Sequence, residues 1–154
     1  IPPHQVRDTT PHVRDPERTP MQWTAGPHAG FSSAKPWLPL ERTYKQRNVD
    51  VMSKDKHSLL ALYRLLIDLH QKHSALQQGD YLPVVTGHPQ VFGFKRTLDN
   101  QSVTVLINFS AKAALAKTKF GKGKVLASSR MDKHHTTVNL AQLILRPYEA
   151  VIVK

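Results

Sequence analysis

The chain has 154 residues, 40% of them hydrophobic and 21% charged, which allows a packed core and argues against global disorder. It has no cysteine, which excludes disulfides and thiolate metal ligands, and no apolar run of about 18 residues, so we expect no membrane span. The formal net charge is +11, but the basic residues are scattered without a phosphate loop or an aromatic ladder, so we expect no nucleic-acid partner.

The beginning of the chain shows neither a starting Met nor the basic-then-apolar pattern of a secretory signal. We therefore expect it to begin inside a longer protein, and the absence of cysteine favours a cytoplasmic one. Residues 1–54 hold most of the eleven prolines and show no sustained helical or strand period. Because proline fixes φ and lacks a donor, this stretch is predicted to be irregular coil with short turns.

A helix is predicted from about residue 55 to residue 73. Its apolar positions recur at spacings of three and four, which is typical of one helical face. Asp55 is the predicted N-cap, and Gly79 with Asp80 marks a turn after the helix. The residues of the predicted face are Leu59, Leu62, Tyr63, Leu66, His70 and His73, widened by Leu60 and Ile67. We expect this helix to be buried over much of its circumference.

From Tyr81 onward the sequence favours strands. Residues 91–97 and 103–109 form two β-rich runs joined through 98–101, which predicts a hairpin. Further short strands are predicted at 124–127, 136–138 and 148–153. Several short strands separated by turns indicate an antiparallel β-sandwich. One helix and a proline-rich loop cannot bury their apolar surface on so small a sandwich, so we expect a larger partner upstream.

The segment 14–23 reads Arg-Asp-Pro-Glu-Arg-Thr-Pro-Met-Gln-Trp and resembles the loop RDPxRTPMQW of glycoside hydrolase family 13. The α-glucosidases, oligo-1,6-glucosidases and trehalose-6-phosphate hydrolases of this family carry that loop. Thr24 departs from the family pattern, which usually has Asp after the Trp. Other segments that resemble the family are 1–3, 29–31, 35–39, 48–49, 58–64, 73–76 and 79–80.

The resemblance implies a fragment of a (β/α)₈ barrel followed by an antiparallel β-sandwich C-terminal domain. Residues 1–79 would be the end of the catalytic barrel, with the loop after the last strand over 1–54 and the last helix over about 55–73. Residues 80–154 would be the sandwich domain. The family's catalytic carboxylates would all lie upstream, so we expect no catalytic residue in this chain and no activity from it alone.

Arg18 is the residue that we expect to bind substrate. In the matching family loop this Arg binds hydroxyls of the terminal glucose. A guanidinium suits the role because its planar fork donates several hydrogen bonds and keeps its charge. The alternative is a brace, in which Arg18 pairs with Asp15 or Glu17. Arg14 and Asp15 are expected to hold the shape of the loop through salt bridges and turn hydrogen bonds.

Three aromatic residues of the same stretch, Trp23, Phe31 and Trp37, are candidates either for stacking on sugar rings or for pinning the loop onto a barrel. Both interpretations stay open from the residues alone. The adjacent His134 and His135 have no carboxylate or cysteine set beside them, so a surface turn is expected there rather than a metal site. We expect neither a metal nor a cofactor.

The resemblance favours a retaining α-glucosidase that hydrolyses maltose- or isomaltose-type oligosaccharides, with the oligosaccharide and the upstream barrel as its partners. A trehalose synthase-like transglycosylase shares the same loop and remains an alternative. A non-catalytic ancillary subunit of the same fold, like the heavy chains of amino-acid transporters, is another.

Overall fold

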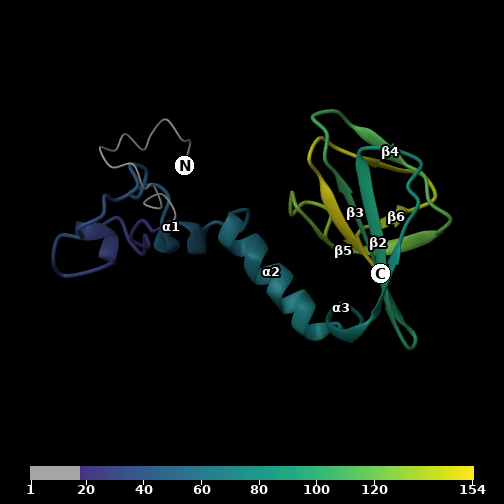
Figure 1. Cartoon of the computed structure of the whole chain (residues 1–154), viewed down its shortest axis with the longest axis horizontal. Coiled ribbons are helices and arrows are strands. Elements are labelled where there is room, and N and C mark those ends of the chain that lie inside the picture. The colour runs from purple at the N-terminus through teal and green to yellow at the C-terminus, as the bar shows by residue number, and fades with distance from the viewer. Residues whose placement is uncertain (1–17) are drawn as a thin grey trace. The chain divides into compact units, whose positions relative to one another are not determined.

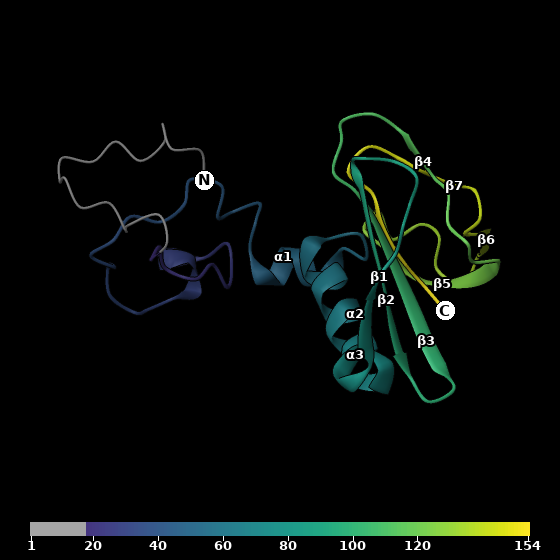
Figure 2. The ribbon, with the colours of Figure 1, turned by 45° about the vertical axis from the view of Figure 1, so that its right-hand side comes forward.

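The structure is a computed structural model that describes residues 18–154 (Figure 1). The chain divides into two compact units, residues 1–61 and residues 62–154. The second unit contains a β-sandwich with helices along one face of its main sheet (Figure 2). None of the helices within residues 18–154 is long and apolar enough to cross a membrane. The expected domain boundary between residues 79 and 80 stays a prediction.

Most of residues 18–54 is loop, as the sequence predicts, but two helical elements interrupt it. A 3₁₀ turn, η3, runs over Pro27–Gly30. The helix α1 runs over Val49–Lys54, in a stretch for which coil is predicted. Asn48 caps α1, because its side-chain oxygen accepts a hydrogen bond from the N–H of Val51. A helix of six residues is too short to show a periodicity, so only its cap signals it in the sequence.

The main predicted helix begins later than expected. α2 runs over Leu59–Lys72, and the hydroxyl of Ser58 accepts the N–H of Ala61, as an N-cap does. Asp55 instead follows α1, and its carboxylate accepts the N–H of His57 in the turn between the two helices. The prediction of Asp55 as the N-cap is therefore wrong, because Ser58 directly precedes the helix and supplies the capping oxygen.

A short helix, α3 (Ser74–Gln78), follows α2 and leads into the sheet. Gly79 ends it in a crowded place. A Cβ at this position would lie 2.4 Å from the carbonyl oxygen of Ala75 and 2.9 Å from that of Thr97. Because both neighbours are backbone atoms, neither can yield without moving α3 or the sheet. Packing at position 79 therefore requires a residue without a side chain.

Six strands form the main sheet in the order β1-β2-β3-β8-β5-β6, with antiparallel pairing throughout. The predicted hairpin is confirmed: β2 (Val91–Leu98) pairs with β3 (Gln101–Asn108) through a turn in which Asp99 has a positive φ. The other strands of this sheet are β1 (Asp80–Pro83), β5 (Lys122–Ser128), β6 (Thr137–Asn139) and β8 (Ala150–Val153). The predicted short strands overlap β5, β6 and β8.

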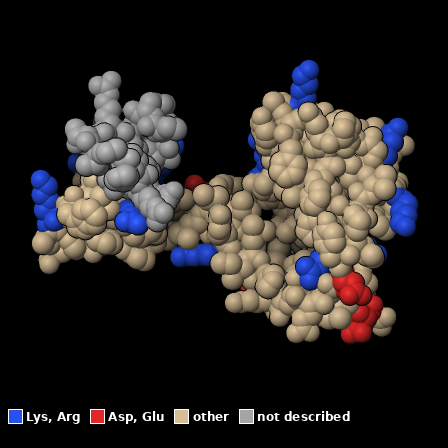
Figure 3. Space-filling view, in the orientation of Figure 1, with Lys and Arg blue, Asp and Glu red and all other residues tan. Residues whose placement is uncertain are grey.

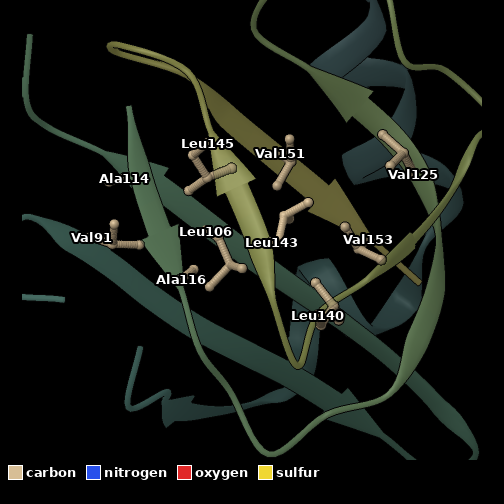
Figure 4. Close-up of a cluster of buried hydrophobic side chains, with 10 residues drawn as sticks. All are labelled: Val91, Leu106, Ala114, Ala116, Val125, Leu140, Leu143, Leu145, Val151 and Val153. Atoms are coloured by element: carbon tan, nitrogen blue, oxygen red, sulfur yellow. The ribbon is translucent and has the colours of Figure 1, made fainter. Parts of the chain in front are cut away.

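A second, two-stranded sheet completes the sandwich. β4 (Ala114–Ala116) pairs antiparallel with β7 (Leu143–Leu145), and the sequence predicts neither strand. Side chains from both sheets meet in one buried cluster, shown as sticks in Figure 4. The cluster comprises Val91, Leu106, Ala114, Ala116, Val125, Leu140, Leu143, Leu145, Val151 and Val153. The fold is therefore the antiparallel sandwich that the sequence predicts.

The other face of the main sheet carries a second cluster, in which Leu69 of α2 packs with Val103, Leu126 and Ala127. β3 is consequently buried on both faces through Val103 and Leu106, which lie in different clusters. The expected burial of α2 over much of its circumference is wrong for this chain, because within residues 18–154 only the side facing the sheet is covered. The large apolar residues of α2 that stay exposed are Leu59, Tyr63, Leu66 and Ile67.

Candidate functional site

Arg18 is exposed, and the backbones of the two residues after it, Thr19 and Pro20, are restricted. Pro20 is buried, and proline fixes its own φ. The residue before a proline is held away from the helical region, so Thr19 is restricted as well. Arg18 is therefore the exposed end of a short, stiff stretch, and Pro20 at the other end of that stretch is buried.

A closed turn follows this stretch. The N–H groups of Trp23 and Thr24 both donate to the carbonyl oxygen of Ala29, at 2.8 and 3.0 Å. Ala29 is fully buried and has a φ of 56°, in the left-handed region. Gly30 also has a positive φ, and a Cβ there would lie 2.8 Å from the hydroxyl oxygen of Thr24. The segment 29–31 is thus the tight end of a closed loop.

The start of α1 holds the same loop from another side. The N–H of Val49 donates to the carbonyl oxygen of Gln22, and the N–H of Asp50 donates to that of Trp23, each at 3.0 Å. The first N–H groups of a helix have no partner within the helix, so the loop carbonyls satisfy them. This anchor is not predicted from the sequence, although Asn48 ahead of α1 is a signal for a helix cap.

The three aromatic candidates are all substantially exposed, with 48% of Trp23, 49% of Phe31 and 85% of Trp37 accessible. Trp23 and Phe31 lie at the two ends of the closed loop, where the N–H of Phe31 donates to the carbonyl oxygen of His28 at 3.0 Å. Trp37 belongs to a different feature, an open groove of about 460 Å³ that His28 and residues 35–40 also line. Stacking on a sugar and packing on a barrel both stay predictions for these rings.

The remaining predicted site residues are not located by the structure. Arg14 and Asp15, expected to brace the loop, lie outside the described residues 18–154, as does Glu17. The choice between a sugar-facing Arg18 and a bracing Arg18 therefore stays a prediction.

Two carboxylates converge on Arg146 in the sandwich unit. The guanidinium donates to Asp132 at 2.6 and 2.9 Å and to Glu149 at 2.7 and 3.2 Å. Lys133 adds a salt bridge of 2.9 Å to Glu149, whose side chain is fully buried. Within residues 18–154, Asp132 and Glu149 are a pair of carboxyl groups that lie close together. Their pKa values show whether they could act as a catalytic pair in glycoside hydrolysis.

Both carboxyl groups of the cluster are strongly acidic. Hydrogen bonds from Arg146 lower the pKa of Asp132 to about 2. Burial alone would raise the pKa of Glu149, but hydrogen bonds from the side chain and backbone of Arg146 and from Lys133 bring it to about 2. Glycoside hydrolysis needs one carboxylic acid with a raised pKa to protonate the leaving group. The cluster therefore stabilises the sandwich and does not form a catalytic pair.

The polar features set aside by the sequence analysis behave as surface groups. His134 and His135 lie in an exposed turn, as predicted, with ring centroids 3.8 Å apart. Residues 18–154 contain no group of three or more His, Cys, Asp or Glu placed to hold a metal ion. On the face shown in Figure 3, Lys and Arg side chains lie in separate spots rather than in one patch. Dispersed charge of this kind is typical of a solvated surface.

Comparisons with known proteins give this geometry a context. Residues 4–79 match the family described as Alpha amylase, catalytic domain. The oligo-1,6-glucosidase of Parageobacillus thermoglucosidasius is 34% identical over 144 residues, which cover 92% of this chain and 25% of that protein. The trehalose-6-phosphate hydrolase of Escherichia coli (strain K12) is 30% identical over 90% of this chain and 25% of that protein.

A solved structure is similar over the same span. The trehalulose synthase MutB from Pseudomonas mesoacidophila MX-45 superposes with a TM-score of 0.80 at 29% identity, covering 92% of this chain and 26% of that one. The chain thus spans about a quarter of the length of the relatives that it matches. The likeness runs through both compact units and is not confined to the sandwich.

Proposed function

Because the chain belongs to the α-amylase family, glycoside hydrolase family 13, we propose that it is the C-terminal part of a retaining α-glucosidase. The proposed reaction removes terminal α-linked glucose from maltose- or isomaltose-type oligosaccharides. The observation that carries the proposal is the likeness to oligo-1,6-glucosidases, at 34% and 33% identity over nine tenths of the chain or more. Trehalose-6-phosphate hydrolases match over the same region, which supports an exo-acting enzyme on glucosides.

The position of the carboxylates indicates which part of the full-length protein would supply the catalytic groups. A retaining glycosidase uses a nucleophile and a general acid/base whose carboxyl groups stand about 5 Å apart. Within residues 18–154 the carboxylates that converge are those on Arg146, and with both pKa values lowered neither can serve as the general acid. We infer that a barrel outside this chain supplies both catalytic groups and that Arg18 binds hydroxyls of the terminal glucose. The exposure of Arg18 on a stiff stretch supports this role.

The test compares the full-length protein with this chain alone. NMR should show that full-length protein releases α-glucose first from isomaltose or maltose, because retention preserves the α configuration. The chain alone is expected to release no glucose above a heat-killed control. Initial release of β-glucose would contradict a retaining mechanism. Turnover by the chain alone at the full-length rate would contradict the placement of the catalytic groups.

A second candidate is a transglycosylase, and the likeness to a trehalulose synthase favours testing it. The same assay decides, with sucrose and maltose as substrates. Formation of an isomeric disaccharide faster than hydrolysis of isomaltose would favour the transglycosylase. A full-length protein without turnover on any of these sugars would favour the ancillary subunit instead.

A further inference from the structure

Asn48 is a polar residue that the fold buries almost completely, with 2% of its surface exposed. Its amide nitrogen donates to the carbonyl oxygens of Tyr44 and Lys45, at 2.7 and 3.2 Å. Its amide oxygen accepts the N–H of Val51 at 2.9 Å. Asn48 thus uses both ends of its side chain on backbone groups and joins the preceding turn to the first turn of α1.

This side chain sets where the first N–H groups of α1 point. Asn48 has φ −144° and ψ 167°, the extended conformation of an N-cap, so the helix starts at Val49. The N–H groups of Val49 and Asp50 then face the carbonyl oxygens of Gln22 and Trp23. Without the cap, these two donors lose their fixed direction and the loop loses two of its anchors.

The anchored carbonyls lie only a few residues after Arg18. Pro20, which is buried, lies between Arg18 and these carbonyls; it fixes its own φ and restricts the conformation of Thr19. A stiff connection transmits displacement, whereas a flexible one would absorb it. A shift of the Gln22 carbonyl is therefore expected to move the guanidinium of Arg18, although Asn48 itself is remote in sequence.

We propose that Asn48 is a positioning residue for Arg18: by capping α1 it holds the loop of Gln22 and Trp23 and so aims the guanidinium at the substrate. This inference rests on the proposed function, in which Arg18 binds the terminal glucose. Asn48 touches no substrate in this scheme. Its effect on the reaction passes entirely through Arg18.

The experiment is a double-mutant cycle in the full-length enzyme, with isomaltose as substrate. Asn48→Ala is combined with Arg18→Ala, and kcat/KM is referred to the folded fraction measured at the assay temperature. Misplacement of a binding group by about 1 Å can cost up to about 100-fold, so we expect Asn48→Ala alone to lower kcat/KM by roughly 10-fold. In the Arg18→Ala background the same change should cost less than about twofold, because coupled residues are not additive.

Two further variants separate positioning from stability. Ser58→Ala removes a comparable buried cap, since the Ser58 hydroxyl accepts from Ala61 and donates to Met52. It should lower the melting temperature without lowering kcat/KM of the folded enzyme. Val49→Pro deletes the donor to Gln22 while keeping α1, because proline is favoured at the first helical position and Asn48 is already extended. It should reproduce the kinetic loss, again only when Arg18 is present.

The outcomes are distinct. If Arg18→Ala alone leaves kcat/KM within twofold, the proposed substrate role fails and the inference fails with it. If Arg18→Ala lowers kcat/KM but Asn48→Ala costs the same factor in both backgrounds, only the inference fails and Asn48 is structural. If Asn48→Ala does not fold, Val49→Pro decides through the same cycle, and an unchanged kcat/KM in that folded variant would overturn the inference.

Discussion

At the scale of single residues, proposed substrate binding depends most on the Arg18 guanidinium. Truncation to Ala would leave glucose hydroxyls without a charged partner. Loss of such a hydrogen bond costs about 1.5–3 kcal/mol. We therefore expect kcat/KM of the full-length enzyme to fall roughly 10- to 150-fold. Arg18→Lys should be nearly as damaging, because an ammonium does not reproduce the planar fork.

Steady-state kinetics on maltose and isomaltose, with thermal melts, check this prediction. Arg42→Ala is the matched control, since Arg42 is an exposed arginine of the same unit. It should leave both kinetics and melting unchanged. If Arg18→Ala keeps kcat/KM within twofold but melts earlier than Arg42→Ala, then Arg18 is a brace for its loop and not a substrate ligand.

The Arg146 cluster gives the sandwich a pH dependence. The ordinary pKa values of Asp132 and Glu149 are 3.8 and 4.5, and both fall to about 2 in the folded chain. Because the folded state holds these protons less tightly than the unfolded state does, stability is fully present above about pH 4.5. It should be lost progressively as the pH falls from there through about 2. Urea unfolding at pH 7, 4 and 3 measures this slope.

Substitutions in this cluster distinguish the contribution of the buried Glu149 to stability from that of the half-exposed Asp132. Arg146→Met leaves the buried Glu149 with Lys133 as its charged partner and with the backbone N–H of residue 146, and breaking a buried pair in this way costs about 3 kcal/mol. Asp132→Asn removes a half-exposed partner and should cost less than about 1 kcal/mol. Both should flatten the acid limb of the stability curve. If the two variants lost the same free energy of unfolding at pH 7, the buried Glu149 would contribute no more to stability than the half-exposed Asp132.

At the scale of elements, α2 exposes an apolar face. Leu59, Tyr63 and Ile67 recur four residues apart on this face, and all three are exposed. Exposed apolar stripes of this kind mark a surface that another domain covers. The proposed upstream barrel is a partner of the right kind, since the match to a catalytic domain covers residues 4–79 and so includes α2.

We predict that Ile67→Asp will destabilise the full-length protein by about 2–4 kcal/mol, because it would place a charge in an apolar interface. In this chain alone the same change should stay within about 0.5 kcal/mol, as surface substitutions do. Lys72→Gln, which makes the same change in net charge at an exposed position of α2 off this stripe, is the control. Chemical denaturation of both proteins makes the comparison, and equal effects in the two contexts would remove the case for a covering domain.

The elements also show what the sequence can predict. The β2–β3 hairpin is predicted because apolar and polar residues alternate strictly on either side of a recognisable turn. β4 and β7 are missed because three residues each cannot establish a period. The exposed face of α2 is misjudged for a different reason. A 3.6-residue period identifies an apolar face but does not say whether its partner belongs to the same chain.

In the candidate site, too, the sequence predicts only the features whose signal is local in the chain. Arg18 and the aromatic residues are found by their resemblance to a family loop, which is local in sequence. The anchor of that loop is not local: Val49 and Asp50 donate backbone N–H groups to loop carbonyls more than twenty residues earlier in the chain. Backbone hydrogen bonds leave no mark on side-chain composition. The sequence therefore signals this anchor only through the helix cap, Asn48, before the six residues of α1.

At the scale of the whole molecule, the two compact units differ in how they are stabilised. Both hydrophobic clusters lie in residues 62–154. Within residues 18–54 the buried hydrophobic residues are Ala29 and Leu38, too few to form a core. Backbone hydrogen bonds hold the loops there, and such bonds open easily where little apolar surface is buried.

Hydrogen exchange on this chain alone tests the difference. Amides in β2, β3 and β8 should exchange slowly, because these strands surround the main cluster and lie inside the sheet. Amides of residues 18–54 should exchange rapidly. In the full-length protein the second group should become protected as well, if a barrel covers it. Uniform protection in the chain alone would show that residues 18–54 need no partner.

The strand order carries a consequence for biosynthesis. β8 is the last strand in chain order, yet it lies between β3 and β5 in the main sheet. On the ribosome, β1 to β3 and later β5 and β6 emerge as two separate groups, and no strand pairs with both groups until Ala150–Val153 has appeared. A product that stops before Ala150 would expose two unpaired strand edges, the surfaces at which sheets aggregate. Cells are therefore expected to degrade such a product rather than accumulate a nearly intact sandwich.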